Sequence, residues 1–402
     1  MDKNRYSIKG KDDTIMRYNF DEILYSKKLS MKWEDADKSY NGTNLLPMWI
    51  ADMDFSPAPA IASVLKYRST NPYLGYRGLS DKYYQSIIDW FKKRFHYSIN
   101  REWILPMSGI TNAIGYGIRA LTSEKDEIII MPPVYPYFKT VIENNGRVAR
   151  ECALINENGF YKIDFDLIER SITSKTKMIV LCSPHNPVGR VWSHKELERL
   201  ASICKENHLF VISDEIHCDI IFKQKHTIFS ELLEEQSIVC TAPTKSFNIA
   251  GVPMANILIP NSEIRDLFCK QLLINNEWTL NTFASDLLVA AYNDSEEWLD
   301  CVLDYINKNI ELFVDYVKNN IPNLKCIKPE GTYFVWVDFS GLNMSSEALK
   351  AFLVDKCKLA VNYGGEFGEE SKLFARFNLA CSEKIVVEAL NRLENSVNAL
   401  SN

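Results

Sequence analysis

The chain has 402 residues, of which 46% are hydrophobic and 24% charged, so it is long enough for two packed lobes. Its formal net charge of −6, without a basic face, argues against nucleic acid or an acidic membrane surface as a partner, and no apolar run reaches the ~18 residues of a membrane span. The ten cysteines form no C-x-x-C pair, which excludes a zinc ribbon and a dithiol motif. Scattered cysteines and a charged N-terminus without an apolar stretch predict a cytoplasmic protein whose partners are small molecules or proteins.

Short β-rich runs alternate with helical patterns over residues 45–290. The runs are EIIIMPP from Glu127, RVAREC from Arg147, KMIVLCSP from Lys177, LFVISDE from Leu209, SIVCTAP from Ser237 and NILIP from Asn256. Continuous apolar strands between helices indicate a mainly parallel sheet that is covered on both faces. The helical pattern over 193–208 has Ser193 as its N-cap and Glu196 in the capping-box position. We therefore expect residues 45–290 to form a large α/β domain.

The pattern changes after Leu280. One long helical pattern starts at Ser295 and is closed by Pro322. The strand-like runs TYFVWVDF, KLAVNY and KLFARFNLA follow, separated by helical patterns over 345–356 and 382–400. These elements predict a smaller α+β domain, formed by 1–44 and 291–402 and packed against the large one with a cleft between them.

Polar residues stand at three predicted strand ends, where ligands bind in open parallel sheets. They are Asn186 in SPHNPVGR, Asp214 in SDEIH and Lys245 in TAPTKSF. Taken singly, each has an ordinary structural interpretation as a turn residue, a helix cap or a solvated lysine. Together they fit one ligand, because a buried Asp can hold a protonated ring nitrogen, an Asn can donate to a phenolic oxygen and a Lys can form a Schiff base. These are the contributions that a protein makes to pyridoxal phosphate chemistry.

This ordered Asn, Asp, Lys set resembles that of the fold-type I pyridoxal-phosphate enzymes, the aspartate aminotransferase superfamily. Within it, the segments PMWIADMDF, SPHNPVGRVW, DEIHCD, KSFNIAG, PEGTYFVWVDF and ARFNLA are similar to the MalY/PatB-type C–S lyases, or cystathionine β-lyases, and run in order from about Pro47 to Asn378. The resemblance implies a large domain with a mainly parallel seven-stranded sheet between helices, plus a smaller α+β domain. It also implies pyridoxal 5′-phosphate as the cofactor, Lys245 as the catalytic residue and a small-molecule amino acid as the substrate.

The resemblance assigns further residues to the cofactor. It implies that Tyr135 in PPVYPYF stacks on the cofactor ring, where the sequence alone would predict a turn with core aromatics. The backbone amides that begin the helix GITNAIGYGIRAL suit a phosphate; they belong to Ser108, Gly109, Ile110 and Thr111. Tyr76 in LGYRG matches a tyrosine that reaches the phosphate in the neighbouring subunit. A homodimer with active sites at the subunit interface is therefore expected.

The resemblance also implies how the substrate is bound. Arg376 in FARFNLA matches an arginine that forks the substrate α-carboxylate, whereas without the family it would be assigned to an edge-strand salt bridge. Ile50 and Ala51 are expected to contact the substrate. His217 is expected to support the cofactor ring, although a lone histidine is more often a core or loop residue.

Two features depart from the family or mislead. The position three before the lysine, often Ser in the superfamily, is Ala242, and no arginine follows Lys245 closely because residue 253 is Pro253. The hydroxyl candidates for the phosphate are therefore Thr241, Thr244 and Ser246, of which Thr244 is assigned to the cofactor. GYGIRA, from Gly115, formally matches a dinucleotide-binding pattern, but it lies inside an apolar helical pattern, so helix packing explains its glycines better.

Three functions are compatible with these residues. In a β-elimination, Lys245 removes the Cα proton and a thiolate leaves Cβ, so that L-cystathionine or a cysteine S-conjugate yields a thiol (homocysteine from cystathionine), pyruvate and ammonia. An aminotransferase would use the same lysine but would need a 2-oxo acid acceptor. A binding scaffold without turnover would have no need to retain Lys245, Asp214 and Arg376. The family motifs favour elimination, and candidates for the pocket wall beyond Cβ are Trp49, Ile50, Tyr363 and Phe367.

Overall fold

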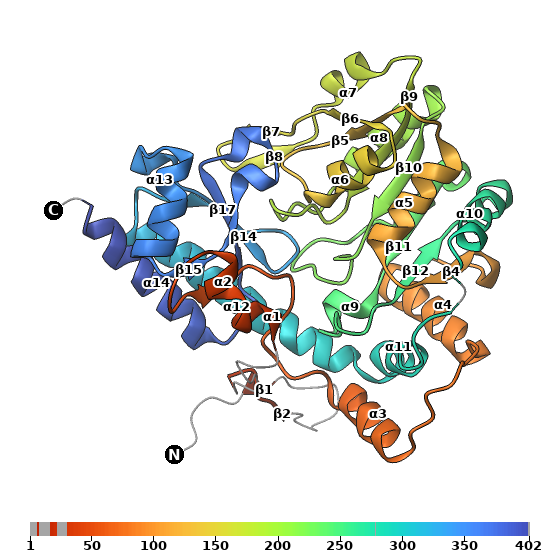
Figure 1. Cartoon of the computed structure of the whole chain (residues 1–402), viewed down its shortest axis with the longest axis horizontal. Helices are drawn as coiled ribbons and strands as arrows, with labels where there is room; N and C mark the ends of the chain where they lie inside the picture. The colour runs from red at the N-terminus through yellow and green to blue at the C-terminus, as the bar shows by residue number, and fades with distance from the viewer. Residues whose placement is uncertain (1–5, 8–16, 22–29, 278, 401–402) are drawn as a thin grey trace.

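The computed structural model describes the chain except for residues 1–5, 8–16, 22–29, 278 and 401–402. It has two parts (Figure 1): a seven-stranded sheet with its helices on the right, and a smaller sheet with the C-terminal helices on the left. Within the described part of the chain, every helix is too short or too polar to cross a bilayer.

The large sheet has the strand order β4-β12-β11-β10-β9-β5-β6. All neighbouring pairs from β11 to β6 are parallel, and β12 runs antiparallel to both β11 and β4. The strands are β4 (Ile104–Met107), β5 (Glu127–Ile130), β6 (Val148–Glu151), β9 (Thr176–Cys182), β10 (Phe210–Asp214), β11 (Ser237–Thr241) and β12 (Ala255–Leu258). The six predicted strands are thus confirmed, and β4 is an additional edge strand whose Pro106 is tolerated because it has one neighbour only.

Both faces of this sheet are buried by helices. Ile128 and Ile130 of β5 pack in one apolar cluster with α5, whereas Ile129 between them packs in another cluster with α8. The helices of this part are α3 (Pro59–Thr70), α4 (Asp81–Phe95), α5 (Ile110–Leu121), α6 (Tyr137–Asn144), α7 (Phe165–Ser171), α8 (His194–Glu206), α10 (Ser262–Ile274) and α11 (Ala284–Asp294). The two-sided burial explains why the strands appear as continuous apolar runs.

Two local predictions for these helices are confirmed. The Ser193 side chain accepts from the backbone of Glu196, and the Glu196 side chain accepts from the backbone of Ser193, which completes the capping box of α8. In α5, a Cβ built on Gly117 would lie 2.7 Å from Ile212 Cδ1 of β10. The GYGIRA glycines therefore belong to a helix, and Gly117 lets it pack closely on the sheet.

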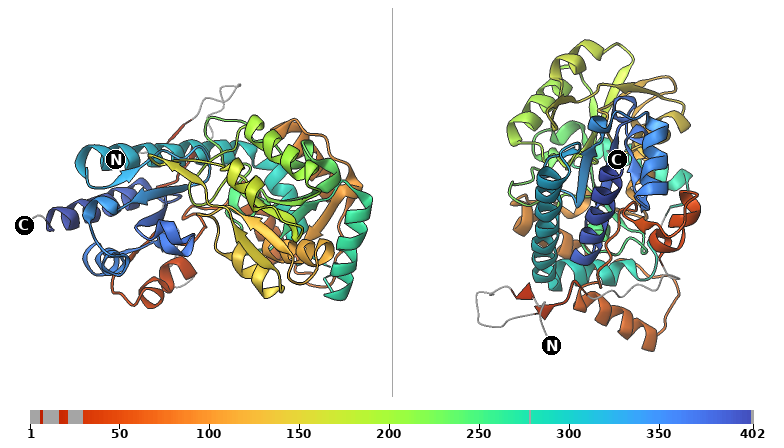
Figure 2. Two further views of the ribbon diagram at one scale, coloured as in Figure 1. Left: turned by 90° about the horizontal axis from the view of Figure 1, so that it is seen from above. Right: turned by 90° about the vertical axis from the view of Figure 1, so that its left-hand side faces the viewer.

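The smaller sheet is antiparallel, with the order β13-β14-β17-β16. Its strands are β13 (Lys325–Cys326), β14 (Phe334–Asp338), β16 (Asn362–Tyr363) and β17 (Phe374–Asn378), and its helices are α12 (Glu296–Asn320), α13 (Ser346–Ala351) and α14 (Glu383–Asn398). The long helix α12 lies beside α14 (Figure 2). The predicted strand KLAVNY is divided, because β15 (Leu359–Ala360) pairs with β3 (Leu46–Pro47) while β16 pairs with β17.

Much of the N-terminal stretch that the sequence assigns to the smaller domain, 1–44, lies outside the described residues. The described pieces include β1 (Tyr6–Ser7), β2 (Arg17–Tyr18), α1 (Met31–Glu34) and α2 (Ala36–Ser39). In Figure 1, α1 and α2 lie next to β15, on the side of the molecule that holds the C-terminal helices.

Candidate active site

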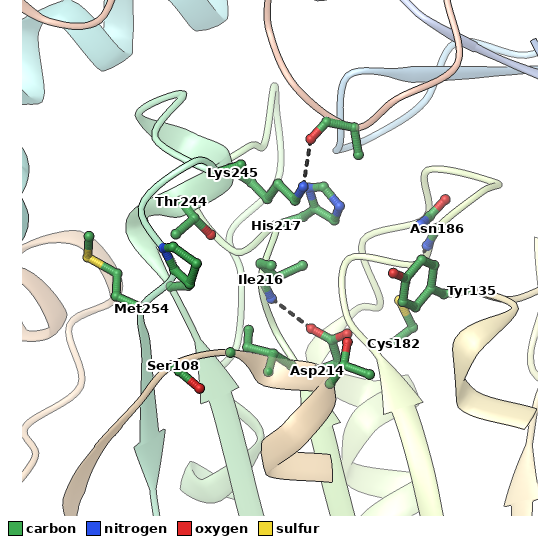
Figure 3. Close-up of a pocket in the computed structure, with 17 residues that line it drawn as sticks. Ser108, Tyr135, Cys182, Asn186, Asp214, Ile216, His217, Thr244, Lys245 and Met254 are labelled. Carbon is green, nitrogen blue, oxygen red and sulfur yellow. Dashed lines mark hydrogen bonds between the residues drawn. The ribbon is translucent and has the colours of Figure 1, made fainter. Parts of the chain in front are cut away.

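Three neighbouring strands of the large sheet deliver Asn186, Asp214 and Lys245 to one cavity of about 320 Å³ (Figure 3). Asp214 ends β10, Asn186 follows β9, and Lys245 lies in the short helix α9 (Pro243–Ser246) just after β11. The register places Asp214 beside Cys182 of β9 and Cys240 of β11, so the three carboxyl ends are level. This is the sheet edge at which the sequence predicts a ligand.

The turn that carries Asn186 has a specific backbone requirement. Gly189 has φ +71°, and a Cβ there would lie 2.3 Å from Pro329 Cβ. The turn is closed by the bond from Gly189 N to His185 O, at 2.7 Å. Glycine at this position therefore lets the turn pack against the loop before β14 and keeps Asn186 at the cavity.

Asp214 is a buried carboxyl with a free side toward the cavity. It is 6% exposed, and its Oδ1 accepts from the backbone of Ile216 at 3.1 Å. Among the described residues, no basic side chain lies within ion-pair distance of it. Burial raises the pKa of Asp214 to about 7, although the bond from Ile216 and the charge of Lys245 oppose the shift. A cation brought to Asp214 would therefore relieve the cost of burying the charge.

Lys245 reaches across the cleft to the segment after β3. Its Nζ donates to the carbonyl oxygen of Ala51 at 2.6 Å. Burial lowers the pKa of Lys245, and the charge of Arg376 lowers it further. The charges of Asp52 and Asp214 act in the opposite direction, but the net shift of the Lys245 pKa is downward. Lys245 is thus more readily neutral than an exposed lysine, as a nucleophile or base must be.

The segment after β3 also contributes two carboxylates to a buried ion cluster. Lys32 of α1 is 1% exposed, and its Nζ lies 3.1 Å from Asp54 Oδ1 and 3.6 Å from Asp52 Oδ1. Asp54 Oδ1 also accepts from Trp33 Nε1 at 3.1 Å. Sequence reasoning missed this cluster, because nothing in the local pattern of α1 signals a buried lysine.

Arg376 lies in β17, an inner strand of the smaller sheet, so the edge-strand interpretation is wrong. Its Nη1 donates to Asn186 Oδ1 at 2.9 Å, and its Nη2 donates to Trp49 O at 2.9 Å and Asn362 Oδ1 at 2.5 Å. The guanidinium carbon is 3.9 Å from the centre of the Phe334 ring. Among the described residues, no carboxylate lies within ion-pair distance, and burial lowers the pKa of Arg376 to about 10. The group is a buried cation with neutral acceptors only, suited to a carboxylate ligand.

The other predicted cofactor contacts mostly line the same cavity. They are Tyr135, His217, Gly109, Ile110, Thr111 and Thr244, together with Ser108 and Ala51. His217 stands edge-on to Tyr333 and Phe334, and its Nδ1 is buried without a hydrogen-bond partner among the described residues. Burial lowers the pKa of His217 to about 3. Its ring is therefore neutral at physiological pH.

Of the three hydroxyl candidates, only Thr244 faces the cavity. Thr241 Oγ1 donates to Asn256 O at 3.3 Å, and Ser246 Oγ donates to Asp219 Oδ2 at 3.0 Å. Both hydroxyls are thus used elsewhere. Ser108 donates its backbone NH to Glu277 Oε1 at 3.1 Å, and its hydroxyl contacts the same oxygen.

Three residues assigned to the site do not line this cavity: Arg376, which borders a second cavity, Tyr76 and Ile50. Tyr76 is 93% exposed on the loop between α3 and α4. Ile50 contributes its carbonyl oxygen to Asn378 Nδ2, at 2.6 Å. The pocket-wall candidate Phe367 borders a second cavity, which also meets Tyr135 and Arg376.

Sequence reasoning also missed part of the cavity wall. The missed residues are Cys182, Ile216, Ala250 and Met254. Two of them could have been found, because Ile216 follows Asp214 by two positions and Cys182 ends the neighbouring strand. The others come from the loop after α9, which has no periodic pattern.

The chain is similar to known proteins over most of its length. A family model described as aminotransferase class I and II matches residues 45–393. Cystathionine beta-lyase PatB of Bacillus subtilis (strain 168) is 34% identical over 370 residues, which cover 91% of this chain and 96% of PatB. The structure of cystalysin from Treponema denticola, which contains pyridoxal 5′-phosphate, has a TM-score of 0.92 at 35% identity and covers 96% of this chain and 100% of its own.

A third relative has a different description. The "PLP-bound putative aminotransferase" of Clostridium difficile 630 has a TM-score of 0.92 at 41% identity, covering 95% of this chain and 100% of its own. The comparisons confirm the fold and the family resemblance expected from the sequence. Of the relatives named here, PatB is described as a lyase and the Clostridium difficile protein as a putative aminotransferase.

Proposed function

This chain belongs to the aminotransferase class I and II family, whose cofactor is pyridoxal 5′-phosphate, and from that premise we propose that it is a C–S β-lyase. Its substrates would be L-cystathionine or related cysteine S-conjugates, and its products a thiol, pyruvate and ammonia. The 34% identity to PatB over nearly the whole chain supports this reaction.

The residues present fit the cofactor. Asp214 is a buried carboxyl without a basic partner among the described residues, which suits a protonated ring nitrogen. Asn186 Oδ1 is occupied by Arg376, which leaves Nδ2 to donate to a ring oxygen. The amides at the start of α5 and the hydroxyl of Thr244 border the same cavity and suit the phosphate.

Each side chain then has a defined task. Arg376 binds the α-carboxylate of the amino acid, which replaces some of the neutral groups that accept hydrogen bonds from the guanidinium. Lys245 would hold the cofactor through Nζ and, once free, would remove the Cα proton with the same nitrogen. When bound, the cofactor would supply an acceptor for the electron pair left at Cα. Asp214 would hold the ring nitrogen of the cofactor in its protonated form, which would make that uptake favourable.

The carbon–sulfur bond breaks after the Cα proton has been removed. The thiolate leaves Cβ with the bonding electron pair, and hydrolysis of the remaining three-carbon unit gives pyruvate and ammonia. The low polarity around Lys245 favours its neutral form before the proton transfer. The observation that supports the proposal is therefore the placement of Lys245 and Asp214 in one cavity, with Arg376 hydrogen-bonded to Asn186 in the wall of that cavity.

An aminotransferase is the second candidate, favoured by the 41% identity to the Clostridium difficile protein. The test is to incubate the cofactor-loaded protein with L-cystathionine, L-cysteine and S-alkyl cysteines and to measure pyruvate without any 2-oxo acid. Elimination predicts pyruvate from at least one of these substrates. Amino-group transfer that appears only after a 2-oxo acid is added would reject the lyase.

We also propose a homodimer in which Tyr76 serves the partner's site. Several large apolar side chains near it in the sequence are exposed: Leu65 is 40% exposed, Tyr67 65%, Tyr73 62% and Leu74 70%. A subunit contact over this part of the chain would remove that apolar surface from water. A mixture of Lys245→Ala and Tyr76→Ala subunits, refolded together, should regain activity that neither variant has alone, because each hybrid holds one intact site. The absence of such recovery would argue against a role across subunits.

For the compartment, we propose the cytoplasm. All ten cysteines are free thiols, which suits a reducing environment. Mass measurement under reducing and non-reducing conditions of the protein isolated from cells would reveal any disulfide that contradicts this.

A further inference from the structure

A second cavity, of about 440 Å³, adjoins the proposed active site. Tyr135 lines both cavities, and Arg376 lines the second one while it donates to Asn186 in the first. A substrate with its carboxylate on Arg376 and its amine near Lys245 would therefore stand at the junction of the two cavities. The part of the substrate beyond Cβ then has the second cavity open to it.

The wall of this cavity has one anionic group. Tyr137 and Phe367 supply aromatic surface, and Thr140 and Asn362 supply neutral polar groups. Glu366 is the one acidic side chain among the described residues that line it, and Arg376 is the one basic side chain. Once Arg376 holds the α-carboxylate, no other basic side chain among the described residues that line the cavity is left to balance the charge of Glu366.

Glu366 stands in a fixed position at the end of the 3-10 turn Gly364–Glu366, directly after β16. Asn362 and the charges of Arg376 and Lys350 stabilise its carboxylate, but burial outweighs them and raises the pKa of Glu366. Lys350 itself lies over the ring of Tyr363, with Nζ 5.4 Å from the ring centre. A cationic ligand in the cavity would offset the cost of burying Glu366.

We propose that this second cavity binds the thiol portion of the substrate and that Glu366 selects thioethers whose thiol portion carries an ammonium group. The proposal rests on the proposed β-elimination, and it names the substrate class of the same site. Thioethers of cysteine with an amino group beyond the sulfur, L-cystathionine among them, fit it. Those with only a carboxylate beyond the sulfur do not, since like charges repel.

The test uses three cysteine thioethers of similar length: S-(2-aminoethyl)-L-cysteine, S-propyl-L-cysteine and S-carboxymethyl-L-cysteine. Binding is measured from the absorbance of the loaded cofactor in a Lys245→Ala background, in which turnover does not interfere. Pyruvate formation is measured separately with Lys245 intact. Glu366→Gln keeps the shape of the side chain without its charge. Glu369→Gln is the matched control, because Glu369 is exposed and contacts Lys372 outside the second cavity.

With Glu366 present, we expect the aminoethyl compound to bind at least about tenfold more tightly than the propyl compound, the size of one charge-assisted hydrogen bond, and the carboxymethyl compound to bind most weakly. Glu366→Gln should reduce the aminoethyl preference to about twofold or less and leave propyl binding unchanged, whereas Glu369→Gln should keep the wild-type order. Equal weakening of all three compounds by Glu366→Gln, or tightest binding of the carboxymethyl compound, would overturn the proposal. A failure of the proposed function would appear differently, as no pyruvate from any compound while the binding order persists.

Discussion

Arg376 of β17 and Asn186 of the turn after β9 share a hydrogen bond of 2.9 Å, from Nη1 to Oδ1. The bond joins the smaller sheet to the edge of the large sheet that carries Asp214 and Lys245. Both side chains are about 5% exposed, so water competes little for it. The group proposed to bind the substrate and the group proposed to bind the cofactor ring therefore orient each other.

Arg376→Lys should weaken substrate binding without loss of the cofactor. A lysine presents a point charge and cannot make the paired hydrogen bonds of a guanidinium, so kcat/KM should fall roughly 100-fold, mainly through KM. The cofactor absorbance should be unchanged, and Arg199→Lys, on an exposed arginine, is the control. An unchanged KM would show that the α-carboxylate binds elsewhere.

Lys245→Ala should abolish turnover and leave the fold intact. Loss of a general base costs at least about 100-fold in rate, and here the same group also holds the cofactor. Pyruvate release and far-ultraviolet circular dichroism are the two measurements. Lys270→Ala, at an exposed lysine of α10, should behave as wild type. Wild-type rates in Lys245→Ala would refute the assigned role.

Asp214→Asn should change how the stability of the cofactor-free protein depends on pH. Burial raises the pKa of Asp214 to about 7 from its ordinary value of 3.8, so the folded chain retains a proton that the unfolded chain loses. The associated stability is fully present below about pH 4 and is lost as the pH rises through about 7, a difference on the order of 4 kcal/mol. Free energies of unfolding in urea, compared with those of wild type between about pH 5 and 8, should show a shallower decline for the variant. Asp266→Asn, at an exposed carboxyl, should leave the slope unchanged.

Gly117→Ala should destabilise the protein more than Gly115→Ala. A Cβ on Gly117 would lie 2.7 Å from Ile212 Cδ1, whereas one on Gly115 would lie 3.3 Å from Val141 Cγ2. The tighter site should cost about 1–3 kcal/mol through overpacking, whereas at Gly115 the higher helix propensity of alanine, up to about 1 kcal/mol, offsets most of the strain. Ile212→Val removes the clashing methyl group and should restore part of the stability of Gly117→Ala. Equal costs at both glycines would contradict the packing explanation.

The large sheet could be predicted from the sequence because its strands are buried on both faces. Continuous apolar runs such as 177–184 can be recognised as strands without knowing which strands lie beside them. Strand β4 escaped prediction because it is short, contains Pro106 and is defined by its pairing with β12. The division of KLAVNY depends on which strands lie beside it, which local pattern does not reveal.

The candidate site could be predicted where its residues stand at strand ends. The contacts between distant segments could not, since Lys245 meets a carbonyl 194 residues away at Ala51. Nothing in the sequence around Glu366 indicated that this residue lines a cavity. The choice of Thr244 over Thr241 and Ser246 required side-chain directions that only the fold supplies.

The buried Lys32 limits how far the chain can be trimmed. A shortened form that began after α1 would lose the cation that pairs with Asp52 and Asp54, and Asp52 is one of the carboxylates that act on Lys245. Removing one member of a buried ion pair typically costs about 3–5 kcal/mol. Variants designed for crystallisation or expression should therefore keep the sequence from residue 30 onward, although the α/β domain itself is expected to start near residue 45.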